Sequence, residues 1–172
     1  MRQSNIIFIY HNNYMSIAHQ KENRMITYEE LHQQNHAITE ISNVLLYLIE
    51  ERSMCDTQIT CDLFFDYVDK VKNHLEIQDL HMYNILLTKG DSESKKVADN
   101  FMSGSKEIKR IFQSYQKKWS NKQNHALRIS NYDQFKKETR EMFDLVLKRI
   151  QDETERLFPL VKEVSGDYQQ VA

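Results

Sequence analysis

Residues 98–119 read ADNFMSGSKEIKRIFQSYQKKW, and this stretch decides the fold class. Its apolar residues recur in steps of three and four, which places them along one side of an α-helix. The residues on this side are Ala98, Phe101, Ser105, Ile108, Phe112, Tyr115 and Trp119. Polar and charged residues fill most positions between them. The pattern predicts a long amphipathic helix with one buried face.

Three other stretches repeat this period. The first begins near Thr27, the second near Thr57 and the third at Asn131. Their inward positions are Leu31, Ile38, Ile41, Leu45 and Leu48; Phe64, Val68, Val71, Leu75, Met82 and Leu86; and Phe135, Thr139, Met142, Val146, Ile150, Glu153 and Leu157. With residues 98–119, the chain therefore has four amphipathic helical stretches.

The segments between these stretches carry helix-ending and helix-starting residues. A break is expected at 52–54, and 120–130 is expected to be a loop. Gly90 suits a helix C′ cap, and Asp91 suits the N-cap that follows. Asn131 has Gln134 three residues on, which is a capping-box spacing. Pro159 predicts a kink or an end late in the fourth helix.

The composition fits one helical domain. The 172 residues include 3 Gly and 1 Pro, too few for a turn-rich β fold. Four amphipathic helices with mostly short connections predict an all-α, antiparallel up-down-up-down four-helix bundle over 26–165, followed by a tail over 166–172. Residues 1–25 lack a helical period and fit three interpretations: a poorly ordered arm, an added strand, or an upstream extension of the reading frame.

Charge and motifs exclude several functions. The net charge of −2 gives no general attraction to nucleic acid, and no apolar run is long enough to cross a membrane. Cys55 and Cys61 form neither a disulfide framework nor a zinc pattern, so we expect a cytoplasmic protein. No phosphate loop, serine elbow or Cys/His nucleophile spacing is present, so we expect no enzyme.

Polar residues interrupt the apolar stripes at informative positions. Ser105 interrupts the third stripe and Glu153 the fourth, while His74, Gln78 and His81 share a face of the second helix. A buried carboxylate requires a cation, a metal or a donor nearby. An ion pair is the commoner solution for Glu153. Arg149, one turn earlier, is a ready partner.

Two of these segments resemble a known family. The stretch VKNHLEIQDLHMY (71–83) and the stretch RIQDETERLFPL (149–160) resemble the second-helix and fourth-helix signatures of hemerythrin-like (HHE cation-binding) proteins. Residues 101–119 resemble the third helix of a bacterial branch of that family. The resemblance implies a four-helix bundle. In metal-binding members, it also implies a di-iron centre held by several histidines and two bridging carboxylates.

Residue by residue, most ligand positions of the family are changed here. His74 and Glu153 match ligands, whereas Gln78, Ser105 and Arg149 stand where a carboxylate and two histidines are expected. On the first helix, the apolar register places Asn35 toward the core. It places His36, the apparent ligand, about 100° away.

Two interpretations of this site follow. The first is a metal-free polar cluster in which Arg149 makes a bidentate contact with Glu153, and its members are Asn35, His74, Gln78, Ser105, Arg149 and Glu153. The second is a di-iron or mononuclear iron site using His74, Glu153 and His36. His32 or His81 serves as a ligand only if the predicted helix registers are wrong.

The first interpretation predicts a non-catalytic regulatory protein that binds a protein partner, such as a transcription or signalling component. At the level of fold, the chain is similar to the regulator of sigma D family. A partner surface is expected at Lys106, Lys109, Arg110 and Lys117, although such a charged run also suits a plain solvated face. The second interpretation predicts an iron protein that senses oxygen or nitric oxide or handles iron.

Overall fold

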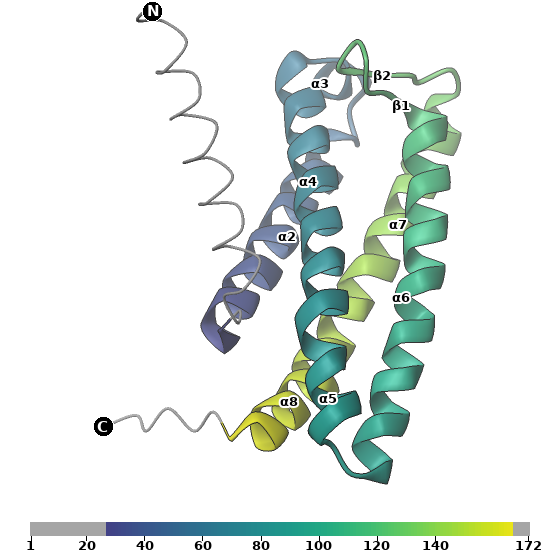
Figure 1. The fold of residues 1–172 in the computed structure, drawn as a ribbon. Coiled ribbons are helices and arrows are strands. Elements are labelled where there is room, and N and C mark those ends of the chain that lie inside the picture. Colours follow the sequence, from purple (N-terminus) through teal and green to yellow (C-terminus); the bar gives the residue numbers. More distant parts are fainter. Residues whose placement is uncertain (1–26, 167–172) are drawn as a thin grey trace, which may run out of the picture.

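The computed structural model describes residues 27–166, so the expected arm at 1–25 and the tail beyond Gly166 lie outside the described residues. Within 27–166 the chain is all-α apart from one short strand pair (Figure 1). The α-helices are α2 (Tyr28–Leu48), α3 (Arg52–Cys55), α4 (Gln58–Ile77), α5 (Tyr83–Lys89), α6 (Ser92–Trp119), α7 (Tyr132–Asp152) and α8 (Phe158–Ser165). Two π-helical turns, η1 (Gln78–Met82) and η2 (Glu153–Leu157), and strands β1 (Ser120–Asn121) and β2 (Ala126–Leu127) complete it.

Four long helical segments lie side by side (Figure 1). They are α2, the continuous run α4–η1–α5, α6, and the continuous run α7–η2–α8. Helix α2 contacts α4 and α7, and α6 also contacts α4 and α7. At the opposite end from the strand pair, α5 contacts α6 and α8. This arrangement lets each helix bury its apolar stripe against two neighbours.

Side chains cap the first residues of α2, α4, α6 and α7, and the sequence predicts the caps at Asp91 and Asn131. Asp91 Oδ1 accepts a hydrogen bond from the Ser94 backbone N–H at 2.8 Å, and Asn131 Oδ1 accepts one from Gln134 at 3.0 Å. Thr57 caps α4 in the same way. At Thr27 the capping box is complete, with Glu30 bonding back to the Thr27 backbone N–H. These bonds satisfy N–H groups that a helix start otherwise leaves unpaired.

Three boundary predictions need correction. The expected break at 52–54 is the short helix α3. The expected loop 120–130 contains the antiparallel pair β1–β2. Gly90 ends α5, but in extended backbone rather than the left-handed form of a C′ cap. Its role is steric, because a Cβ there would lie 2.4 Å from the Leu86 carbonyl oxygen.

Pro159 does not end the last helix. It lies in the first turn of α8, and the chain stays helical from α7 through η2 into α8. A proline lacks the N–H for an intrahelical bond and clashes with the carbonyl one turn earlier. The wider π turn immediately before α8 gives the backbone room for this residue.

Apolar residues form two clusters along the helices. The larger, which we call the hairpin-end core, includes Phe64, Tyr67, Phe112, Phe143 and Trp119. The smaller, the α8-end core, consists of Leu31, Met82, Tyr83, Leu86, Ala98, Phe101, Leu157 and Phe158. The predicted stripes are buried except at Leu48, which is half-buried. The next residue, Ile49, is buried instead of Leu48, with 1% of the Ile49 surface exposed.

None of the helices within residues 27–166 is both long and apolar enough to cross a membrane.

Candidate functional site

A layer of polar side chains separates the two apolar cores. On each long segment the polar residue falls between inward apolar neighbours: Asn35 on α2, Gln78 on η1, Ser105 on α6 and Glu153 on η2. His74 and Arg149 lie one turn before Gln78 and Glu153. The six residues that we call the polar layer are Asn35, His74, Gln78, Ser105, Arg149 and Glu153, and each is at least nine-tenths buried.

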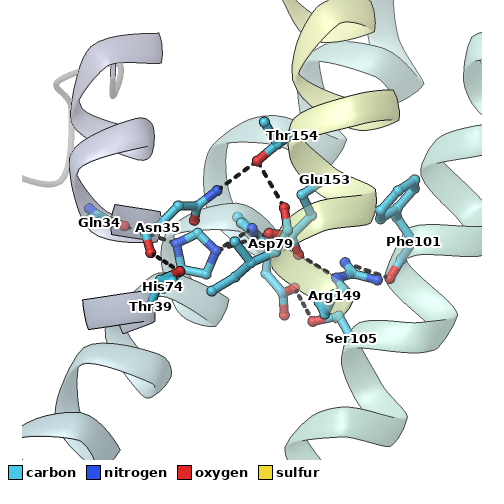
Figure 2. Close-up of polar contacts among 12 residues, drawn as sticks. Gln34, Asn35, Thr39, His74, Asp79, Phe101, Ser105, Arg149, Glu153 and Thr154 are labelled. Carbon is cyan, nitrogen blue, oxygen red and sulfur yellow. Dashed lines mark hydrogen bonds and ion pairs between the residues drawn. The ribbon is translucent and has the colours of Figure 1, made fainter. Parts of the chain in front are cut away.

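Glu153 is the centre of the polar layer (Figure 2). Its side chain is fully buried, and its two oxygens face different basic groups. Oε1 accepts a hydrogen bond from Arg149 Nε, and Oε2 lies 3.0 Å from His74 Nε2. A carboxylate removed from water is costly unless it is paired and hydrogen-bonded. Both conditions are met here by residues of the chain itself.

Arg149 is held on several sides besides Glu153. One terminal nitrogen donates to the Tyr83 hydroxyl at 2.6 Å and to the Phe101 carbonyl at 3.2 Å. The guanidinium also lies 4.5 Å from the centre of the Phe101 ring, a cation–π distance. The predicted bidentate contact with Glu153 is therefore wrong. Only the Nε–H group reaches the carboxylate, and the Nη2 group donates to the α8-end core instead.

Small residues make room for this guanidinium. A Cβ added at Gly104 would lie 3.1 Å from an Arg149 terminal nitrogen, tighter than ordinary contact. Tyr83 is buried on the other side. Burial raises the pKa of the Tyr83 hydroxyl to about 12, although the neighbouring Arg149 charge opposes the rise. The phenol therefore stays protonated at physiological pH.

His74 connects three helical segments. Its Nδ1 lies 3.1 Å from Gln34 Oε1 on α2, and its Nε2 faces Glu153 on η2. The two ring nitrogens thus face oxygens on two different segments. Gln78 Nε2 also lies 2.7 Å from His74 Nε2. A half-turn of the Gln78 amide places its oxygen there instead, as an acceptor.

The register argument for the first helix is confirmed. Asn35 is buried and its Nδ2 donates to Thr154 Oγ1 at 3.2 Å. His36 is exposed and lies 3.1 Å from Glu40 on the outer surface of α2. One residue along the helix thus separates a layer residue from a surface residue, and His36 lies outside the layer.

Ser105 belongs to the edge of the layer. Its hydroxyl donates to Asp79 Oδ1 at 3.0 Å, not to Glu153 (Figure 2). The other Asp79 oxygen lies 2.5 Å from Lys109 Nζ. Asp79 is partly exposed, so this group connects the buried layer to the surface of α6.

Both π turns begin at the layer. η1 starts at Gln78 and η2 starts at Glu153, on the two segments that pack on either side of α2 and α6. A π turn adds one residue to a helical turn and shifts the faces of the residues that follow. Two consecutive residues are buried where each turn ends, at Met82–Tyr83 and at Leu157–Phe158.

The donor set does not fit the di-iron centre that the family resemblance implies. Among residues 27–166, no three His, Cys, Asp or Glu side chains gather as metal ligands. The layer offers one imidazole and one carboxylate, and Arg149 is bonded to that carboxylate. A metal ion bound to Glu153 would lie beside a fixed positive charge, which repels it.

The other histidines considered as ligands lie elsewhere. His32 is half-buried, with its ring 4.3 Å from the Tyr28 ring and 6.0 Å from the Phe158 ring. His81 is half-buried on η1. Neither forms a hydrogen bond or an ion pair with the polar layer within the described part of the chain.

The expected partner surface on α6 divides into two kinds of residue. Lys109 pairs with Asp79, and Arg110 pairs with Glu107 at 2.6 Å. Lys106 and Lys117 are exposed, and no carboxylate of residues 27–166 pairs with them. They lie 11 residues apart, about three helical turns, and so on the same side of α6.

The structure adds residues to the site that the sequence reasoning missed. Gln34, Tyr83, Asp79 and Thr154 contact layer residues directly. Asp79 and Tyr83 stand inside the family-like stretch 71–83, which was a usable signal. Gln34 and Thr154 are polar residues on amphipathic helices, where nothing in the pattern separates them from surface residues.

Comparison with known protein families, with curated proteins and with solved structures finds no match to this chain. The resemblance to hemerythrin-like proteins therefore rests on the sequence stretches alone.

Proposed function

We propose that this chain is a hemerythrin-like, antiparallel up-down-up-down four-helix bundle that regulates by binding a protein partner and has no catalytic centre. The four long helical segments and the polar layer support this assignment. His74 and Glu153 lie together at the positions where the resemblance expects ligands. Around them stand Asn35, Gln78 and Arg149, which hold the layer together without a metal.

The contact between Arg149 and Glu153 carries the proposal. A guanidinium built into the chain neutralises the one carboxylate at the centre of the layer, which a metal ion would do in an iron-binding relative. This makes the fold independent of a cofactor. It also removes the redox or oxygen-binding chemistry that a metal would supply, and leaves the surface as the functional part.

The surface that suits a partner is the outer side of α6. Lys106 and Lys117 project there without carboxylate partners in the described residues. Unpaired lysines attract an acidic segment over about one Debye length, ~8 Å at physiological ionic strength. We therefore propose a partner that presents acidic residues, such as an acidic helix of a transcription or signalling protein.

The test is capture of partners by the purified full chain at low and at high salt. The Lys106→Glu/Lys117→Glu double variant reverses both free charges. The Lys137→Glu/Lys148→Glu double variant on α7 is the matched control, because it also reverses two exposed charges but on another helix. The proposal expects one specific protein that binds the wild type and the control, is released by salt, and is lost with the double variant.

Two results would contradict the proposal. In one, the double variant retains the same proteins as the wild type, which would exclude this face of α6. In the other, the purified chain turns over a substrate in a way that depends on His74 and Glu153, which would give the layer a catalytic role.

A further inference from the structure

A second polar group lies away from the polar layer, where α4, the end of α6 and the β1–β2 turn meet. Lys72 on α4 donates from Nζ to Gln116 Oε1 on α6 at 2.5 Å. Because an ammonium can only donate, this contact fixes which end of the Gln116 amide faces Lys72. The Gln116 Nε2 group is then buried, with no hydrogen-bond partner among residues 27–166.

A second ammonium lies beside the first. Lys122 follows β1 directly and is close enough to Lys72 to act on it electrostatically. Burial, followed by the neighbouring Lys122 charge, lowers the pKa of Lys72. Asp69 and Glu76 on α4 act in the opposite direction, but neither is within ion-pair distance of Lys72 in residues 27–166.

Gln116 Oε1 accepts from Lys72, whereas the two ammonium groups and the Gln116 Nε2 group are all donors. Two like charges held near each other repel, and a buried amide N–H without a partner is destabilising. An anion placed between them would relieve both costs. Both lysine stems are long and flexible, so their ammonium groups can separate to admit it to the Gln116 amide.

We propose that Lys72, Gln116 and Lys122 form a binding site for a small oxyanion, that is, a phosphate or carboxylate group. The amide would donate to one oxygen and the two ammonium groups to the others. The site is separate from the polar layer and from Lys106, so it does not depend on the proposed function.

The test is a titration of the isotope-labelled full chain, followed by NMR of the Gln116 side-chain amide. Inorganic phosphate and acetate are added separately, with chloride at the same ionic strength as the reference. The phosphate and acetate arms distinguish the two kinds of oxyanion. We expect saturable shifts of the Gln116 amide signals with at least one of them, and none with chloride.

Three variants make the result specific. Lys122→Gln is expected to weaken oxyanion binding by about tenfold or more, since it removes a charge-assisted contact. Gln116→Glu replaces the donor by a carboxylate that can pair with Lys72, so it should remain folded and lose binding. Lys106→Gln removes one charge elsewhere on α6 and should bind as the wild type does.

The proposal is overturned if phosphate and acetate shift the Gln116 amide no more than chloride does. It is also overturned if Lys106→Gln weakens binding as much as Lys122→Gln, because the effect would then reflect net charge alone.

Discussion

The hairpin-end core and the polar layer stabilise the same helices in different ways. The hairpin-end core packs aromatic rings such as those of Tyr67 and Phe143, whose centres lie 4.2 Å apart. Its contribution to stability comes from the apolar surface that it removes from water. The polar layer is just as buried, yet its centre is one carboxylate between Arg149 and His74. Apolar packing tolerates a substitution of similar volume, whereas a buried charge tolerates no loss of its partner.

The largest expected difference comes from removing the cation of the layer. Arg149→Leu should lower the free energy of unfolding by about 3–5 kcal/mol, because it leaves the Glu153 carboxylate buried without its guanidinium partner. Ile150→Val, at the next position and in the hairpin-end core, should cost about 0.5–1.5 kcal/mol. Urea unfolding followed by circular dichroism compares them. Equal losses for the two variants would show that the layer is not electrostatically special.

A double variant separates the lost charge from the lost packing. Arg149→Leu/Glu153→Gln should be more stable than Arg149→Leu alone by about 1–3 kcal/mol, since no unpaired charge remains. The same unfolding measurement reports it. A double variant less stable than Arg149→Leu would mean that Glu153 contributes through contacts other than its charge pair with Arg149.

Tyr83 should make the stability of the folded chain depend on pH. Its pKa is raised from 10.0 to about 12 in the folded chain, so its contribution is complete below pH 10 and is lost as the pH rises from 10 toward 12. Over that window the wild type should lose about 2 kcal/mol more than Tyr83→Phe does. Burial also raises the pKa values of Tyr67 and Tyr115, so the variant keeps an alkaline slope.

The unfolding free energy of both proteins, measured at pH 9 and pH 11.5, tests this prediction. Identical alkaline losses would show that Tyr83 does not carry the effect. At neutral pH, Tyr83→Phe should cost about 1 kcal/mol for the hydrogen bond to Arg149.

The smallest expected contrast is between neighbours on α2. Asn35→Ala removes the hydrogen bond to Thr154 and should cost about 1 kcal/mol, whereas His36→Ala on the surface should stay within about 0.5 kcal/mol of the wild type. Thermal unfolding of the two variants measures the difference. A larger loss for His36→Ala would contradict the assigned register of α2.

The helices and most of the layer followed from the sequence because they depend on period and capping. The step of three and four residues places Asn35 inside and His36 outside, and the side chains of Asp91 and Asn131 mark where helices begin. Both kinds of signal are local. A single sequence expresses them without knowledge of the neighbouring helices.

The features that were missed depend on contacts between segments. The π turns at Gln78 and Glu153 have no signature in the sequence, because they depend on how the helices pack around the layer. The expected bidentate contact failed because Tyr83 and the Phe101 carbonyl compete for the Arg149 donors. The Ser105 hydroxyl likewise donates to Asp79, whose other oxygen accepts from Lys109, and not to Glu153.

In our proposal Arg149 replaces a metal at Glu153. Elemental analysis and a visible absorption spectrum of the full chain, purified from iron-rich medium, test this replacement most directly. We predict iron far below one atom per chain, no oxo-bridged absorption band, and the same trace content in His74→Ala/Glu153→Ala. Near-stoichiometric iron that is lost in that double variant would contradict it.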